Sequence, residues 1–486
     1  MLRRVFGLTA LIALLPLAGL SAQSPAADLS EEVQKFVAVD APVVALTGVR
    51  VVDGTGVEPR ENQTIVIRDG RIAAVGPDGE VGIPGDAEVL DREGHTVLPG
   101  FVGLHNHILY TVSGRWTQLS HSAPRLYLAS GVTTVRTTGS FVPYDEINLK
   151  QEIEAGRVPG PAMFVTGPFL TGPEETRWRQ MSQVEGSEDA RRLVEYWAEE
   201  EGVGWFKAYT RISREALGAA IEEAHRRGAK VTGHLCSVTF TEAVELGIDN
   251  IEHGFGTNTG WYPDKEPDAC PDDRAEEVAE HLARLDVDSP EVETTIRTMV
   301  DNDVALTSTL AVAEHSVPDR PPLDRLERTL DVMADEAREG YLETREQIDE
   351  RGPEEIWSDE IFANTRAFER KFHEAGGLLA AGVDPTGIGG ALPGFGDQRN
   401  YELLIESGFD PVTAVEIMTA NGARVLGIYD EVGSIEEGKR ADLVLIDGNP
   451  VENPGDIRSV ETVFKEGVGY DSRKLIDAVE GVVGVR

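Results

Sequence analysis

The chain has 486 residues, 41% of them hydrophobic, and its 85 acidic residues outnumber 45 basic ones to give a net charge of −40. This length and apolar content allow one large folded unit with a smaller partner unit, which excludes a disordered chain. The negative charge repels nucleic acids and anionic lipid surfaces, so neither is expected as a partner, and we interpret it as a heavily solvated surface.

The N-terminus has the layout of a cleaved secretory signal over residues 1–22. Arg3 and Arg4 precede an apolar run that ends near Leu20, and small residues follow it up to Ala22. This layout predicts a periplasmic or secreted protein. An uncleaved anchor is the alternative, but the run contains a proline and barely reaches the length of a spanning helix, so no stable membrane anchor is expected after cleavage.

Short β-rich runs occur near both ends of the chain. They cover residues 43–52, 64–68, 71–75, 87–91, 433–447 and 459–465. Turn sequences such as Asp-Gly separate them, which is typical of a small antiparallel unit. We therefore predict one β-sandwich built from residues 42–97 and 428–470, with the long segment 98–427 inserted between its halves.

The inserted segment alternates strand and helix signals, the pattern of a parallel α/β fold. Its eight candidate strands are residues 101–107, 132–137, 162–167, 205–209, 230–234, 250–254, 304–309 and 378–384. The best-defined helix begins after Ser213 and stops at Gly228. Eight strands with intervening helices predict a (β/α)8 TIM-type barrel. Charged stretches at 255–289 and 314–359 would form a lid over its mouth or solvated surface helices.

Two histidines stand at the end of the first candidate strand. His105 and His107 are separated by one residue, so on a strand they point to the same face. Two neutral imidazoles on one face can bind a divalent metal such as zinc, although such a pair also arises by chance.

Further ligand-type residues stand at the ends of other strands. Lys207 ends the fourth, His234 the fifth, His253 the sixth and Asp384 the eighth. A barrel directs the C-terminal ends of its strands to one rim, so residues far apart in sequence would converge there with the histidine pair. The sequence thus predicts a metal site at this rim.

With these motifs in place, the chain resembles the amidohydrolase superfamily over nearly everything after residue 22. The matching motifs are His105-Asn106-His107, Phe206-Lys207-Ala208-Tyr209, Val231-Thr232-Gly233-His234, Ile251-Glu252-His253-Gly254, Ala381-Gly382-Val383-Asp384 and Gly438-Lys439-Arg440-Ala441-Asp442-Leu443. Their order and spacing are most similar to the imidazolonepropionase-like and Xaa-Pro dipeptidase-like branch. Members of that branch are metal-dependent hydrolases of cyclic amides, peptides and N-acyl amino acids.

The resemblance implies a carboxylated Lys207 that bridges two divalent metal ions, with zinc the first candidate. It places His105, His107 and Asp384 around one ion and His234 and His253 around the other. A bridging hydroxide would attack an amide, peptide or lactam C–N bond, and Asp384 would carry the proton to the leaving nitrogen. The alternatives are a mononuclear imidazolonepropionase-like or deaminase-like hydrolase with an ordinary lysine, and a non-catalytic ligand-binding barrel.

Residues that would contact the substrate are less clearly marked. Tyr209 would donate a hydrogen bond to the oxyanion or substrate, as a second catalytic residue, or would pack as an aromatic. Arg177 and Arg179 would bind a substrate carboxylate or form surface ion pairs. His315 would contact the substrate or lie in an ordinary loop. The expected partner is a small-molecule amide or peptide, and a homo-oligomer is compatible with the sequence.

The chain has two cysteines, Cys236 and Cys270, which allow a single disulfide. An oxidising compartment outside the cytoplasm permits such a bridge. Because the sequence does not give the distance between the two residues, a disulfide and two separate buried thiols stay open as alternatives.

Overall fold

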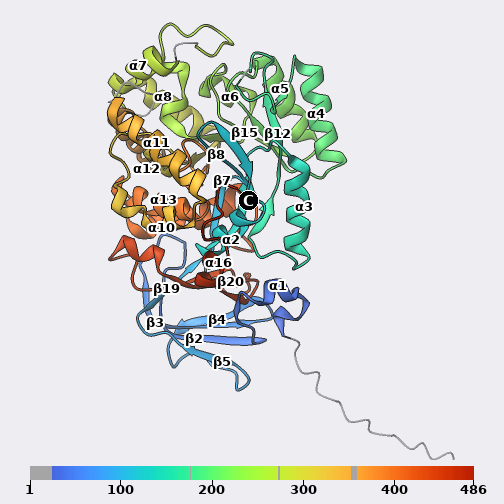
Figure 1. The fold of residues 1–486 in the computed structure, drawn as a ribbon, viewed down its shortest axis with the longest axis vertical. Coiled ribbons are helices and arrows are strands. Elements are labelled where there is room, and N and C mark those ends of the chain that lie inside the picture. Colours follow the sequence, from blue (N-terminus) through green and yellow to red (C-terminus); the bar gives the residue numbers. More distant parts are fainter. Residues whose placement is uncertain (1–23, 176, 272–273, 352–357, 486) are drawn as a thin grey trace, which may run out of the picture.

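The computed structural model describes residues 24–175, 177–271, 274–351 and 358–485. The predicted signal segment, residues 1–22, lies outside them. The chain has a mixed α/β fold in which a β-sheet lies at one end of the molecule and helices surround the strands of the remainder (Figure 1). Among the helices of the described ranges, none combines the length and the hydropathy needed to cross a membrane.

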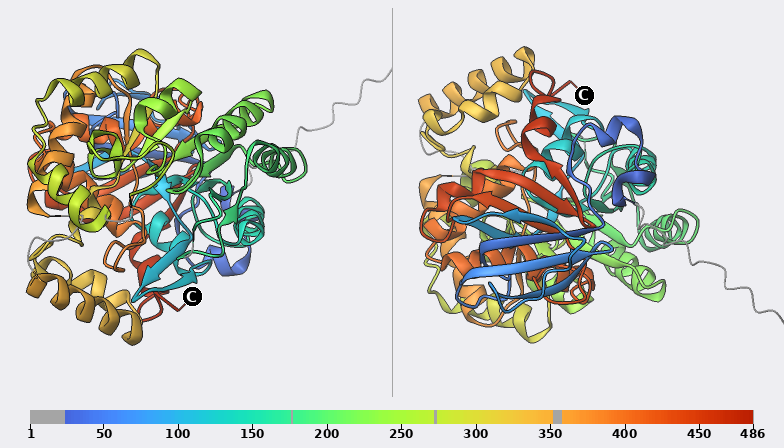
Figure 2. Two further views of the ribbon diagram at one scale, coloured as in Figure 1. Left: turned by 90° about the horizontal axis from the view of Figure 1, so that it is seen from above. Right: turned by 90° about the horizontal axis from the view of Figure 1, so that it is seen from below.

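Both ends of the chain contribute to one nine-stranded sheet. In spatial order its strands are β1 (Val37–Val39), β21 (Val468–Asp471), β20 (Val460–Lys465), β19 (Leu443–Asp447), β6 (His95–Pro99), β2 (Val43–Val51), β3 (Arg60–Arg68) and β4 (Arg71–Pro77), with β5 (Glu88–Asp91) paired to β2. Strands of the two ends pair at two places, where β19 is antiparallel to β6 and β1 is antiparallel to β21. Strands from both ends lie side by side in the view from below (Figure 2). The sandwich and the boundaries 42–97, 428–470 and 98–427 stay predictions.

The middle of the chain forms two parallel sheets. The first has the order β11 (Ala162–Phe164), β10 (Val132–Thr137) and β7 (Phe101–Asn106). The second has the order β13 (Ser182–Gln183), β12 (Thr166–Thr171), β14 (Trp205–Ala208), β15 (Lys230–Gly233), β16 (Asn250–Glu252), β17 (Ala305–Ser308) and β18 (Leu379–Ala381). Ser140 and Pro168 form a parallel bridge between them. At the other edge, the N–H of Asp384, just after β18, donates to the carbonyl of His105 over 2.7 Å.

The predicted third strand, residues 162–167, is two strands in the structure. β11 pairs with β10, whereas β12 pairs with β14 in the other sheet. At the junction the N–H of Thr166 donates to Oγ1 of Thr137 over 3.0 Å. Because a side-chain oxygen there replaces a backbone acceptor, the ladder is interrupted and the chain passes from one sheet to the next. The predicted strand 132–137 has the bounds of β10, and the other predicted strands match β7 and β14 to β18 apart from one to three residues at their ends.

Helices follow most of the parallel strands. The α-helices of the described residues are α1 (Glu31–Gln34), α2 (Ser122–Ala129), α3 (Pro143–Glu154), α4 (Ser187–Glu199), α5 (Arg214–Arg226), α6 (Phe240–Leu246), α7 (Ala279–Arg284), α8 (Pro290–Asp301), α9 (Leu310–Glu314), α10 (Glu327–Val332), α11 (Asp335–Arg351), α12 (Asp359–Glu374), α13 (Phe395–Glu406), α14 (Pro411–Glu416), α15 (Gly422–Leu426) and α16 (Ser472–Asp477). As predicted, Ser213 caps α5 by accepting the N–H of Ala216 over 3.2 Å. The charged stretches 255–289 and 314–359 carry α7, α10 and α11, and their role as a lid stays a prediction.

The two strands β8 (Leu109–Val112) and β9 (Arg115–Gln118) form a hairpin directly after β7. It has a left-handed turn, because Ser113 and Gly114 both have positive φ angles, of 49° and 71°. A turn of this kind matches the twist of the two strands that it joins. The hairpin follows the carboxyl end of β7, where His105 and His107 lie.

Candidate active site

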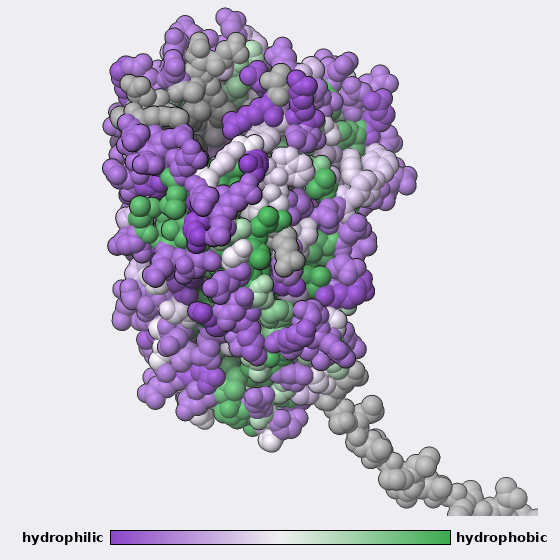
Figure 3. All heavy atoms as spheres, viewed as in Figure 1, coloured by the Kyte–Doolittle hydropathy of each residue, from purple (hydrophilic) through white to green (hydrophobic). Residues whose placement is uncertain are grey.

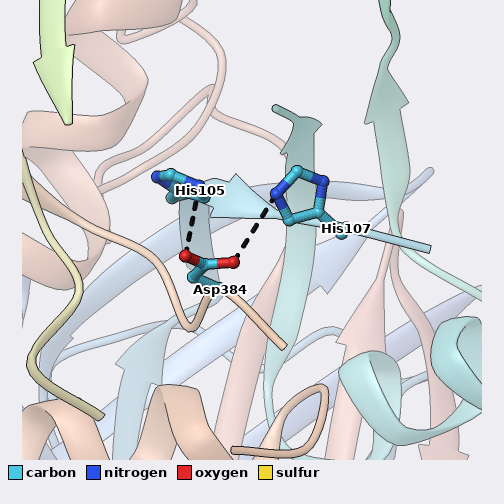
Figure 4. Close-up of side chains that lie close together, drawn as sticks. All are labelled: His105, His107 and Asp384. Carbon is cyan, nitrogen blue, oxygen red and sulfur yellow. Dashed lines mark ion pairs between the residues drawn. The ribbon is translucent and has the colours of Figure 1, made fainter. Parts of the chain in front are cut away.

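His105, His107 and Asp384 converge where β7 and β18 end. Nε2 of His105 lies 3.6 Å from Oδ2 of Asp384, and Nε2 of His107 lies 3.6 Å from Oδ1. The carboxylate therefore faces both imidazoles (Figure 4). One potential ligand atom from each of these buried residues lies within 4.8 Å of the other two. This donor set and spacing suit a single divalent cation.

The backbone after β18 is specialised for this approach. A Cβ atom at position 382 would lie 2.2 Å from the backbone nitrogen of His105, so only glycine fits there. Asp384 then adopts a left-handed backbone with φ of 47°. Few residues other than glycine adopt this conformation, and positions of this kind concentrate at functional sites.

Two more histidines adjoin the cluster. The ring centroid of His253 lies 4.6 Å from that of His105 and 4.4 Å from that of His234. Nε2 of His253 lies 3.9 Å from Oδ2 of Asp384, while its Nδ1 lies 2.7 Å from Oγ1 of Thr309. The hydroxyl thus fixes the ring so that its other nitrogen is directed at the cluster. His253 also has a left-handed backbone, with φ of 68°.

Lys207 contributes a buried amine. Its side chain is 1% exposed, and Nζ has no hydrogen-bond partner within the described residues. Burial lowers the pKa of Lys207 to about 8, although the carboxylates of Glu252 and Asp384 oppose the shift. A buried polar atom without a partner costs free energy. Nζ is therefore suited to interact with a bound group, which would supply the partner that the protein does not.

The protonation states of the cluster suit metal binding. Burial, reinforced by the positive charge of Lys207, lowers the pKa of His107 to about 3 and holds that of His105 well below its ordinary value. Both imidazoles are therefore neutral at pH 7, as metal ligands must be. Burial raises the pKa of Asp384 to about 6, against the effect of a hydrogen bond from Thr386, so its carboxylate is mostly ionised at pH 7.

A buried ion pair supports His105 from the side away from Asp384. Nδ1 of His105 lies 2.7 Å from Oε2 of Glu252, and Nη2 of Arg136 donates to the other oxygen of Glu252 over 2.6 Å. Nε of Arg136 donates to the carbonyl of Leu104 over 2.7 Å, and its guanidinium lies 4.5 Å from the ring centre of Trp205. Neither Glu252 nor Arg136 was predicted from the sequence to be a site residue. The available signal was a charged residue within each of two buried strands.

The cluster opens onto a cavity of about 530 Å³, a volume within the range of small-molecule sites, about 300–1,000 Å³. All six predicted metal ligands line it, as do Tyr209 and Arg177. Arg179 is exposed and does not line it. His315 is buried elsewhere, with Nδ1 2.9 Å from the hydroxyl of Tyr341. The structure therefore brings two of the four predicted substrate residues to the cavity and leaves the other two outside it.

Cys236 and Cys270 form a disulfide, with their Cα atoms 5.1 Å apart. The sequence left open a disulfide or two separate buried thiols, and the structure contains the disulfide. Cys236 lies just past β15 and Cys270 lies in the segment between β16 and α7. Since Cys270 lines the cavity, the bridge fastens one part of the cavity wall to the segment that carries His234.

Comparison with known proteins gives the family. Residues 96–469 match the amidohydrolase family. The chain belongs to this family. This amidohydrolase is 25% identical over 433 residues to a 5-methylthioadenosine/S-adenosylhomocysteine deaminase of Moorella thermoacetica. The aligned region covers 85% of this chain and 86% of that protein.

Two further similarities concern the predicted branch. The amidohydrolase is 40% identical over 70 residues to an imidazolonepropionase of Geobacillus kaustophilus, which covers 13% of this chain and 16% of that protein. A solved structure of a Xaa-Pro dipeptidase with bound methionine in its active site has a TM-score of 0.64 at 19% identity, over 88% of this chain and 100% of that one. Several curated relatives are matched over only 11% to 16% of their own length. The predicted family is confirmed. An imidazolonepropionase is among the proteins of similar sequence, and a Xaa-Pro dipeptidase is among the solved structures of similar fold.

Proposed function

We propose that this amidohydrolase is a metal-dependent hydrolase that cleaves an amide, peptide or lactam C–N bond of a small molecule. The observation that carries the proposal is the buried cluster of His105, His107 and Asp384, which line a cavity and whose ligand atoms lie within 4.8 Å of one another. Amidohydrolases generally use divalent metals, and the donor set of this cluster fits one.

The proposed fold behind this site is a closed (β/α)8 barrel with a β-sandwich from both chain ends. The bridge between Ser140 and Pro168 and the hydrogen bond between Asp384 and His105 support closure, because they join the two parallel sheets at both edges. In such a barrel the carboxyl ends of the strands form the active-site face.

Six residues would hold the metals. His105, His107 and Asp384 would bind one divalent ion, His234 and His253 would bind a second, and carboxylated Lys207 would be shared between them. The buried and unpartnered Nζ of Lys207 supports its modification, since carboxylation would replace the amine by an anionic group with two ligand oxygens. When bound, the ions, with zinc the first candidate, would lower the pKa of water to about 7 and polarise the substrate carbonyl.

The remaining steps fall to side chains of the chain itself. Asp384 would accept the proton of the attacking water and deliver it to the leaving nitrogen, because its carboxylate lies at the centre of the cluster and borders the cavity. Tyr209, whose ring centroid lies 5.1 Å from that of His234, would donate a hydrogen bond to the substrate carbonyl oxygen. Arg177 at the cavity wall would attract a substrate carboxylate.

A mononuclear hydrolase is the second candidate. Within the described ranges, the group that meets the spacing of a metal site consists of His105, His107 and Asp384 without the other two histidines. The relative that matches over 433 residues is named as a deaminase. In this case Lys207 would stay an ordinary amine and the protein would saturate with one ion.

Substitution of Lys207 by methionine separates the two candidates. Methionine keeps an apolar chain of similar length but cannot be carboxylated, so the binuclear proposal predicts loss of metal. Because loss of a residue that only supports a metal ligand already costs about 10- to 100-fold, amide hydrolysis should fall by at least about 100-fold. Metal analysis and activity are measured on the same preparation.

Lys230→Met is the matched control, because Lys230 lies on the adjacent strand and donates to the carbonyl of Val425 over 3.1 Å, away from the cavity. Two equivalents of metal with full turnover in Lys207→Met would exclude the bridging role. One equivalent in the active wild-type protein would favour the mononuclear candidate. Inactivity of zinc, cobalt and manganese forms on dipeptides, N-acyl amino acids and lactams would favour a ligand-binding protein instead.

We further propose export to the periplasm or beyond. The layout of residues 1–22 and the disulfide between Cys236 and Cys270 both support an oxidising compartment. N-terminal sequencing of the protein from a periplasmic or culture fraction is expected to start near residue 23, and a start at Met1 would contradict cleavage.

A further inference from the structure

One wall of the active-site cavity is aromatic. Phe141, Phe169, Trp178 and Tyr209 line it, and we call these four residues the aromatic wall. They come from four separate segments, after β10, within β12, after β12 and after β14. Leu109, Met181 and Trp116 pack against them in the same hydrophobic cluster. Segments from across the sequence thus place rings at one location.

The rings of the aromatic wall are in contact from the proposed metal ligands outward. The ring centroid of Phe169 lies 6.1 Å from that of His107 and 5.4 Å from that of Phe141. Phe141 in turn lies 5.7 Å from Trp178. Tyr209 joins the series, 5.6 Å from Phe169 and next to the ring of His234. These tilted and edge-to-face contacts are the arrangements that aromatic rings prefer.

The aromatic wall is incompletely covered by protein. Phe169 is buried, but Phe141, Trp178 and Tyr209 keep partial exposure while lining the cavity. Apolar surface in contact with water is unfavourable, and a ligand that covers it recovers that free energy. A ligand that covers these rings would therefore gain binding free energy close to the proposed metal ligands.

Another part of the cavity lining carries no large side chains. The segments after β17 and β18 contribute Val312, Ala313, Ser316 and Gly387 to the cavity lining, all small or medium-sized. Near the rings, Arg177 places its guanidinium 5.2 Å from the ring centre of Trp178. The cavity thus combines an aromatic surface with a cationic group and with small side chains that leave room for a bulky substituent.

We propose that the aromatic wall is the subsite for an aromatic group attached next to the scissile amide, so that the substrates are aryl-bearing N-acyl amino acids or related amides. This inference rests on the proposed function, because it assigns the substrate class of the same site. Removal of an aromatic group from water contributes a free energy that corresponds to roughly a 10- to 100-fold gain in kcat/KM when it is realised in the transition state.

Three probes test the proposal on the metal-loaded protein. N-acetylglycine has no ring, N-benzoylglycine has a ring on the acyl side, and N-acetyl-L-phenylalanine has one on the amine side; all three have one carboxylate. At least one ring-bearing probe is expected to exceed N-acetylglycine in kcat/KM by about tenfold or more. Equal or lower values for both ring-bearing probes overturn the inference and leave the proposed hydrolase function intact.

Binding of the same probes is measured by calorimetry, so that the inference is tested even without turnover. If no probe is cleaved but a ring-bearing one binds about tenfold more tightly than N-acetylglycine, the result supports the aromatic subsite and contradicts the proposed hydrolysis of these amides. Equal binding of all three, without turnover, contradicts both.

Trp178→Ala then assigns the effect to the aromatic wall. The variant should lose about tenfold in kcat/KM or affinity for the ring-bearing probe and less for N-acetylglycine. Phe141→Leu keeps apolar bulk without a ring and serves if Trp178→Ala does not fold. Trp197→Ala, which removes a ring that packs on Tyr144 and Tyr196 outside the cavity, is the control. Equal losses on all probes in Trp178→Ala and in Phe141→Leu would overturn the assignment.

Discussion

Glu252 holds His105 in place through the ring nitrogen that does not face Asp384. Besides Nδ1 of His105, its carboxylate accepts hydrogen bonds from Arg136, Asn250 and Thr232, and it is completely buried. The desolvation of this carboxylate is offset mainly by positive charge on Lys207 and Arg136, which lowers the pKa of Glu252. A metal-binding imidazole fixed in this way keeps one tautomer and one orientation.

Glu252→Gln is expected to weaken metal binding by about 10- to 100-fold. It should also destabilise the fold by about 3–5 kcal/mol, because the buried guanidinium of Arg136 loses its counterion. Competition with a chromophoric chelator measures the first effect and urea unfolding the second.

Glu369→Gln is the matched control for this substitution. Burial raises the pKa of Glu369 to about 8, so its carboxyl is mostly protonated at pH 7, and Gln changes little. Its Oε2 accepts from Ser308 over 2.9 Å, outside the cavity lining. Unchanged metal affinity in Glu252→Gln would remove the positioning role from Glu252.

Residue types at strand ends made the candidate site predictable. His105, Lys207 and Asp384 each follow a recognisable apolar run, so their strands and their common rim could be inferred from local sequence. Arg136 and Glu252 could not be paired in this way, because 116 residues separate them and their contact depends on how the sheets face each other. The burial of His315 against Tyr341 likewise depends on packing that local sequence does not contain.

Among the elements, the strand at residues 162–167 marks the limit of sequence-based prediction. Its apolar pattern continues through Val165, so nothing local indicates that β11 and β12 belong to different sheets. The break depends on the side chain of Thr137, which lies in another strand. The sheet shared by the two chain ends was easier to predict from the sequence, since both ends carry the same alternation of short β runs and turns.

The disulfide between the segments after β15 and β16 is an element-level restraint whose effect can be measured. Its cysteines are 34 residues apart, and closing a loop of this length reduces the entropy of the unfolded chain by an amount worth about 3–4 kcal/mol. The double variant Cys236→Ala/Cys270→Ala should therefore unfold at a lower urea concentration than the wild-type protein.

Reduction of the wild-type protein supplies the control for this variant. Dithiothreitol should lower the urea midpoint of the wild-type protein towards that of the double variant and leave the double variant unchanged. Equal midpoints for oxidised wild type and double variant would show that the bridge adds no stability. A change in KM with the stability retained would instead assign it to the shape of the cavity wall, which Cys270 lines.

At the scale of the whole molecule, the excess of acidic side chains dominates the surface. Hydrophilic residues cover most of the face shown in Figure 3. Surface ion pairs such as Lys150 with Glu154 and Arg297 with Glu293 connect exposed side chains, and pairs of this kind contribute only about 0–1 kcal/mol each. Because the chain carries a net charge of −40, repulsion among unpaired carboxylates opposes the compact state.

Added salt should therefore stabilise the protein. The screening length falls from about 10 Å at 0.1 M to about 3 Å at 1 M ionic strength, so repulsion between distant carboxylates is removed while short ion pairs lose little. We expect Tm to rise by a few degrees between these concentrations, for a gain of about 1–2 kcal/mol. Thermal unfolding in sodium chloride and in tetramethylammonium chloride of equal ionic strength measures the change. Equal increases in both salts would identify screening, a rise in sodium chloride alone would indicate specific sodium binding, and a fall in both would show that ion pairs outweigh the repulsion.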